Sequence, residues 1–174
     1  RQTTSVSGER FTVLEHDVRL SLSNVIAANT HTTAVLAGFF SSRCGAEGRN
    51  GERDRVEFNS FAQPFFDGTN QLSLQAVEYV PHLQSEQQRL AWEADASAWT
   101  GANVTVKAAS QASRPADSGP YFPVGFLWPL EGNEAALMFD LGSSAPRAAA
   151  MALAATQNMT VASAPIRLVQ GAPG

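Results

Sequence analysis

Residues 11–40 carry a repeating pattern of apolar and small side chains. The pattern recurs at alternating spacings of three and four, which is typical of a helix with one packing seam. No glycine or proline occurs between Glu9 and Ala37, so nothing in the sequence interrupts such a helix. The seam positions are Phe11, Leu14, Val18, Ser21, Val25, Ala28, Thr32, Val35 and Phe39. We therefore predict a long amphipathic helix over residues 1–43, ended by a glycine-rich stretch.

The rest of the chain contains segments with the spacing of strands. Alternating apolar and polar residues predict strands over residues 72–81 and 103–110. The runs 121–130 and 135–141 are apolar on both faces and are joined by the turn "EGNE". This arrangement predicts an antiparallel hairpin of two central strands. A last strand is predicted over residues 160–169.

Three shorter helices are predicted between these strands. The first covers residues 56–65. Ser85 and Gln88 form a capping box that begins the second helix, and Gly101 ends it. A serine begins the third, alanine-rich helix, and Asn158 suits the left-handed residue that ends it. The expected fold is therefore α+β, with an antiparallel sheet and helices packed on it.

The composition excludes several kinds of partner. The 174 residues include 44% hydrophobic residues, enough for one compact core. Lys and Arg number 12 against 16 Asp and Glu, and this net charge of -4 argues against nucleic acid and anionic lipid as partners. The single cysteine, Cys44, excludes an internal disulfide and a cysteine-based zinc site. No run approaches the roughly 18 apolar residues that a membrane span needs.

The residues that carry chemistry do not form a catalytic or metal motif. His16, His31 and His82 are far apart, without acidic partners at ligand spacing, so we expect no metal. Motifs of hydrolases, P-loop proteins, dinucleotide-binding proteins and zinc proteases are absent from the sequence. We expect neither a catalytic site nor a cofactor in this segment. Sequons at Asn103 and Asn158 permit N-glycosylation if the chain is extracellular.

Asp140 stands out because it ends an apparently buried strand. The alternation of a strand places it on the same side as Ala136 and Met138. A carboxylate among apolar residues needs hydrogen-bond donors. The donors are either backbone N–H groups of the turn before the cap at Ser143 or Ser144, or groups of a bound ligand. The two interpretations are compatible, and both stay open at this point.

Several of these stretches together resemble the CHASE domain, the extracellular sensory module of membrane-anchored cyclases and histidine kinases. The stretches are "LSLQAVEYVPHLQSEQQRLAWEADA", "YFPVGFLWPLEGNEAALMFDLGSSAPRAAAMALAAT" and "TVASAPIRLVQ", and "VLAGFFSSR" is similar to the end of the family's stalk helix. The resemblance implies a stalk and dimerisation helix over residues 1–43. It also implies a PAS-like ligand-binding lobe over residues 56–170. A second, membrane-proximal lobe follows in the family, and we expect it to be missing from this sequence.

The resemblance also implies particular ligand contacts. In the cytokinin receptors of the family, an aspartate takes two N–H donors of an N6-substituted adenine, and a backbone group of a later strand takes part. These positions correspond to Asp140 and Ala162. The other candidate ligand-binding residues are Met138, Phe126, Trp128 and Thr156. Met138 stands where the family usually has glycine. Replacing Asp140 by alanine is then expected to abolish binding and to leave the fold intact.

The predicted function is that of an extracellular or periplasmic sensory domain of a transmembrane receptor. It would bind a small molecule, with an adenine of the cytokinin type as candidate, and signal to a cytoplasmic nucleotide cyclase or histidine kinase. We expect a homodimer through the N-terminal helix and membrane contact only through flanking transmembrane helices. The alternative is a dimerisation or partner-binding module with no small-molecule ligand, acting through Leu14, Val18 and Val25.

Overall fold

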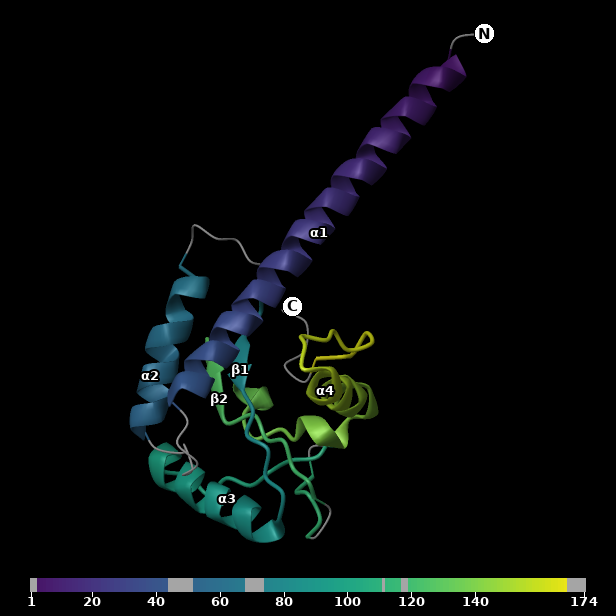
Figure 1. The fold of residues 1–174 in the computed structure, drawn as a ribbon. Coiled ribbons are helices and arrows are strands. Elements are labelled where there is room, and N and C mark those ends of the chain that lie inside the picture. Colours follow the sequence, from purple (N-terminus) through teal and green to yellow (C-terminus); the bar gives the residue numbers. More distant parts are fainter. Residues whose placement is uncertain (1–2, 44–51, 68–73, 111, 117–118, 169–174) are drawn as a thin grey trace. The chain divides into compact units, whose positions relative to one another are not determined.

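The computed structural model describes residues 3–43, 52–67, 74–110, 112–116 and 119–168 (Figure 1). The chain divides into two compact units. The first contains Arg1–Gly45 and Gly68–Leu74, and the second contains Ala46–Asp67 and Gln75–Gly174. Cys44 lies outside the described residues.

A single helix, α1 (Thr3–Arg43), makes up nearly all of the described part of the first unit. Its 41 residues correspond to a length of about 60 Å at the usual rise per residue. The predicted long helix is confirmed. Between His16 and Gly38 most side chains are exposed, and Val18, Leu22 and Ile26 are exposed by 51%, 58% and 65%. These apolar residues are therefore available on the surface of a single chain.

The second unit contains the three shorter helices that the sequence predicts. Helix α2 (Glu52–Ala62) continues into a short 3-10 turn, η1 (Gln63–Phe65), where a proline lies in the first turn. Helix α3 (Glu86–Thr100) and the alanine-rich helix α4 (Ala145–Gln157) follow later in the chain.

The predicted caps of α3 and the predicted end of α4 are confirmed, whereas the Ser144 side chain at the start of α4 makes no capping hydrogen bond. The Ser85 hydroxyl accepts the Gln88 N–H at 3.3 Å and begins α3. Gly101, with φ of 69°, ends α3 in the left-handed region that favours glycine. Asn158 ends α4 in the same way, with φ of 51°. These local signals depend on neighbouring residues only, which is why the sequence predicts them well.

The sheet differs from the prediction. Strands β1 (Val77–Tyr79) and β2 (Phe126–Trp128) pair antiparallel, with Val77 opposite Trp128. The predicted hairpin is confirmed only in part, because β2 pairs with β1 and an isolated antiparallel bridge between Pro123 and Asp140 joins the run 121–130 to the run 135–141. That run forms a 3-10 turn, η2 (Glu134–Ala136), and Met138 has a positive φ of 63°. A left-handed residue cannot continue a regular strand.

The other predicted strands are also reduced. Residues 103–110 make isolated bridges only, from Lys107 to Ser113 and Phe139, and residues 160–168 form no regular strand. The α+β class is confirmed. Within the described residues the sheet has only two strands, so a PAS-like fold is not confirmed.

The core of the second unit is centred on Phe126. Its ring lies 5.4 Å from that of Tyr79, 5.9 Å from that of Phe58 and 6.3 Å from that of Trp92, measured between ring centres. These contacts bring β1, α2 and α3 together around β2. Gly125 makes the approach possible, since a Cβ atom there would lie 2.4 Å from the Trp92 ring.

Buried charges attach α3 to the loops beside it. The Arg89 guanidinium forms ion pairs with both Glu86 and Glu93. The pKa of Arg89 is raised, chiefly by the hydrogen bond to Glu86. Glu93 also accepts the Val106 N–H at 2.7 Å, and the Tyr121 hydroxyl donates to Glu86 at 2.8 Å. The carboxylates of α3 thus hold two distant segments against the helix.

Candidate ligand-binding site

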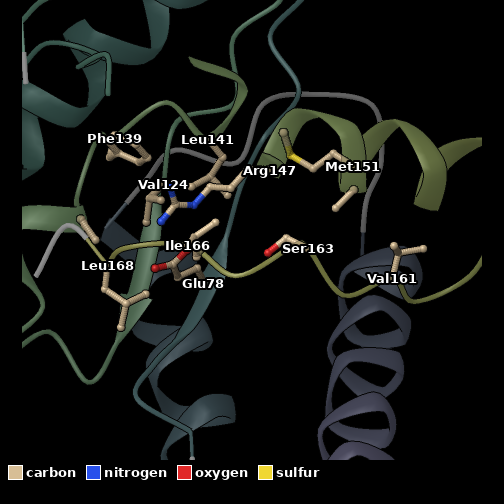
Figure 2. Close-up of a pocket in the computed structure, with 12 residues that line it drawn as sticks. Glu78, Val124, Phe139, Leu141, Arg147, Met151, Val161, Ser163, Ile166 and Leu168 are labelled. Atoms are coloured by element: carbon tan, nitrogen blue, oxygen red, sulfur yellow. The ribbon is translucent and has the colours of Figure 1, made fainter. Parts of the chain in front are cut away.

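A cavity of about 280 Å³ opens between β1, α4 and residues 161–168 (Figure 2). At roughly 30 Å³ per water it holds about nine water molecules, so it is near the lower end for small-molecule sites. Most of its walls are apolar, with a glutamate, an arginine and a serine among them. The lining residues are Glu78, Val124, Ala136, Phe139, Leu141, Arg147, Ala150, Met151, Val161, Ser163, Ile166 and Leu168.

Among the described residues of this lining, Glu78 alone carries a carboxylate. Successive side chains of a strand point to opposite faces. Val77 is buried and Tyr79 stacks on Phe126, so Glu78, between them, points away from that core and into the cavity. Its carboxylate has no hydrogen bond or ion pair with any residue that the structure describes. Burial raises the pKa of Glu78, and the charge of Arg147 opposes this rise.

Arg147 provides the positive charge on the other side of the cavity. It lies in the first turn of α4, next to the proline that starts the helix. Its guanidinium carbon is 5.2 Å from the centre of the Phe139 ring, and one terminal nitrogen is 3.4 Å from the Ser144 hydroxyl. In Figure 2 the Arg147 guanidinium and the Glu78 carboxylate point toward one another. They are too far apart for a direct ion pair, so the space between them is polar at both ends.

Asp140 is completely buried and is held by protein groups. Its Oδ1 accepts the Phe122 N–H at 2.8 Å and the Gly142 N–H at 2.9 Å. Oδ2 lies 2.7 Å from Nε of Arg114, an ion pair in which the N–H is not aligned for a hydrogen bond. The short turn η3 (Leu141–Ser143) begins at this carboxylate. Protein groups thus account for both carboxylate oxygens of Asp140, as expected if its donors come from the protein and not from a ligand.

The remaining predicted ligand residues do not line the cavity. Phe126 and Met138 are buried in the core, and Trp128 is half-buried at the end of β2. Thr156 is exposed, and its hydroxyl donates to main-chain carbonyls of α4. Ala162 is exposed, but it lies between two residues that line the cavity. Asp140, between the lining residues Phe139 and Leu141, lies beside the cavity in the same way, and the ligand roles of all these residues stay predictions.

Sequence analysis missed Glu78 and Arg147. A signal for Glu78 was available in "AVEYV", where one acid interrupts an apolar strand. The position of Arg147 in the first turn of an alanine-rich helix gives no comparable signal, because that turn is more often solvated. Their approach is a tertiary contact between segments about 70 residues apart.

The described residues give no sign of a metal or of a membrane span. In this part of the chain no three His, Cys, Asp or Glu side chains gather in a group that could hold a metal ion. None of the described helices is long and apolar enough to span a bilayer. Both sequon asparagines, Asn103 and Asn158, are exposed.

Comparison with known proteins gives one match. The family model described as CHASE domain matches residues 51–174, which is most of the chain. No curated protein and no solved structure matches. CHASE domains are sensory, non-catalytic domains of membrane receptors, and they are typically extracellular or periplasmic. The resemblance found in the sequence is confirmed.

Proposed function

Because the chain belongs to the CHASE domain family, we propose that its second unit senses a small molecule by binding it in the cavity beside Glu78. The observation that carries this proposal is the carboxylate of Glu78, which faces an apolar cavity without a partner among the described residues. Glu78 is only partly buried, and a ligand that brings N–H or O–H groups offsets the cost of taking its carboxylate out of water. Such unpaired groups are typical of binding sites.

The adenine-type ligand that the resemblance implies is a candidate for this cavity. Its N–H groups suit Glu78, and the backbone next to the cavity at Ala162 supplies further hydrogen-bonding groups. A ligand at Asp140 would have to displace Arg114 or a main-chain N–H, whereas Glu78 requires no displacement. We therefore propose Glu78 as the carboxylate that receives the ligand's donors.

The proposal extends to the whole receptor. Ligand binding on the extracellular or periplasmic side would shift α1, and a pair of such helices would pass the change to a cytoplasmic nucleotide cyclase or histidine kinase. The full-length protein would then be the enzyme, and this segment its sensor. Flanking transmembrane helices would supply the membrane anchor.

A thermal-shift screen tests the binding proposal. A panel of adenines, amino acids, carboxylic acids and other metabolites is added to the chain. A compound present at 100 times its Kd adds about 2.7 kcal/mol of stability, which raises Tm by about 5–10 °C for a protein of this size. We expect Glu78→Gln to remove the shift, while Glu131→Gln, at an exposed turn, keeps it. A panel without any shift contradicts the proposal.

The alternative function, a dimerisation module, is favoured by the exposed apolar residues of α1. Val18, Leu22 and Ile26 are each more than half exposed, and a second copy of α1 would cover them. Analytical ultracentrifugation over a range of concentrations measures this association. Replacing Val18 and Ile26 by serine should shift the chain toward monomer. A wild-type chain that stays monomeric at all concentrations contradicts dimerisation through α1.

A further inference from the structure

We infer that the ligand of the Glu78 cavity is a compact acid, with a carboxylate at the Arg147 end and a hydrogen-bond donor at the Glu78 end. This inference rests on the proposed function. It concerns which chemical class the site selects, and it sets the ligand apart from an uncharged adenine.

A second cavity, of about 450 Å³, adjoins the first near Arg147. The two cavities share Phe139, Arg147, Ile166 and Leu168 in their linings. Arg167 lines the second cavity, so the combined space has arginines on two different segments, α4 and residues 161–168. A single ligand can therefore reach from Glu78 to the arginines.

The charges of the combined lining do not cancel. Among the described lining residues the ionisable ones are Glu78, Arg147 and Arg167, which leave one positive charge in excess. Neither arginine forms an ion pair with a residue that the structure describes. Among the described residues Arg147 interacts with the Phe139 ring and, at 3.4 Å, with the Ser144 hydroxyl, and neither group carries a negative charge. One monoanionic group on the ligand balances the site.

A carboxylate fits this balance better than a phosphate. A guanidinium binds a carboxylate through two parallel N–H···O bonds, and such charged hydrogen bonds are about twice as strong as neutral ones. A phosphate dianion would leave one negative charge in excess inside a partly apolar cavity, which is unfavourable. The apolar walls at Met151, Ile166 and Leu168 suit a short hydrophobic body between the two polar ends.

A matched set of probes tests the inference. The probes are 4-aminobenzoate, which has both groups, 4-aminobenzamide, which lacks the charge, benzoate, which lacks the amine donor, and 4-aminophenyl phosphate, which tests the dianion. Calorimetry or ligand-observed NMR on the whole chain gives the Kd of each. We expect 4-aminobenzoate to bind at least about tenfold more tightly than 4-aminobenzamide, and more tightly than the other two.

Variants identify the groups responsible. Arg147→Gln should reduce the preference for 4-aminobenzoate over the amide to about one, while Arg147→Lys should keep most of it because the charge remains. Glu78→Gln should remove the advantage of 4-aminobenzoate over benzoate. If Arg147→Gln fails to fold, Arg167→Gln and the salt dependence of the wild-type affinity test the same positive charge. The Arg167→Gln substitution and a higher salt concentration should each weaken binding of the acid.

The outcomes separate this inference from the proposed function. If the amide or the phosphate binds as tightly as 4-aminobenzoate, the site binds small molecules but the acid class is wrong. A preference that Arg147→Gln and Arg167→Gln leave unchanged also overturns the inference. If all four probes fail to bind and the metabolite panel gives no shift, both proposals are wrong.

Discussion

Replacing Asp140 by alanine should strongly destabilise the second unit, and not merely abolish ligand binding. The carboxylate is completely buried and serves three partners: the N–H groups of Phe122 and Gly142 and the guanidinium of Arg114. Alanine removes all three interactions at once. The sequence alone suggested that this variant would keep its fold, and the contacts of the carboxylate predict otherwise.

The magnitude follows from these contacts. Each main-chain N–H left without its acceptor costs about 1 kcal/mol or more. Arg114, whose side chain is 17% exposed, loses its ion pair with Asp140, and breaking a buried pair of this kind costs about 3 kcal/mol at the lower end of measured values. The total of about 5 kcal/mol is a third or more of the stability of a typical domain. Asp140→Asn keeps an oxygen for both N–H groups and loses only the ion pair, so about 3 kcal/mol is expected.

Urea denaturation followed by tryptophan emission measures the effect, because Trp92, Trp99 and Trp128 all belong to the second unit. With a slope of about 2 kcal/mol per molar urea, Asp140→Ala should lower the midpoint by about 2.5 M. Asp95→Ala, at an exposed position of α3, is the control and should change stability by less than about 1 kcal/mol.

The double variant Asp140→Ala with Arg114→Ala tests the ion pair separately. It should be less destabilised than the sum of the two single variants, because each single variant already removes the interaction between Asp140 and Arg114. A loss of under about 1 kcal/mol in Asp140→Ala, with an equally cooperative transition, would refute the reasoning. Asp140 would then be available for a ligand, as the resemblance implies.

Three further predictions concern stability. Gly125→Ala should lower the free energy of unfolding by about 1–3 kcal/mol, because the new methyl group would overlap the buried Trp92 ring. Gly38→Ala, with open space around it, is the control and should be neutral or slightly stabilising. Melting temperatures compare the two variants. Ser85→Ala should cost about 1 kcal/mol through loss of the α3 cap, and an unchanged urea midpoint would argue against that cap. The pKa of Glu78 in the folded chain is raised above the ordinary 4.5, so the folded state holds this proton more tightly than the unfolded state. The contribution of Glu78 to stability is therefore greatest below pH 4.5 and falls as the pH rises through its folded pKa. Relative to Glu78→Gln, the wild type should lose stability between pH 4.5 and neutral pH, and a difference that does not vary with pH contradicts the burial of this carboxylate.

The ligand site shows where sequence reasoning was incomplete. Asp140 was singled out because an acid among apolar residues needs donors, and the structure provides those donors from Phe122, Gly142 and Arg114. The same argument applies to Glu78, for which the described residues provide none. Both acids are anomalies of the same kind in the sequence. Only the distances between segments distinguish Asp140, whose carboxylate the protein satisfies, from Glu78, whose carboxylate has no partner among the described residues.

The sequence by itself determined the family, through motifs spread over most of the chain, and the α+β class. It also determined the long α1, the shorter helices and the α3 caps, because these depend on contacts within a few residues. It also predicted that Asp140 has a special role. The tertiary structure decided which strand pairs with β2, and so it decided that the expected hairpin does not form at residues 126–128. The positive φ of Met138 and the packing around Phe126 give β2 the strand at 77–79 as its partner in place of the nearer run. The tertiary structure also brought Glu78 and Arg147 to one cavity, since their meeting depends on how β1 and α4 pack and not on any local pattern.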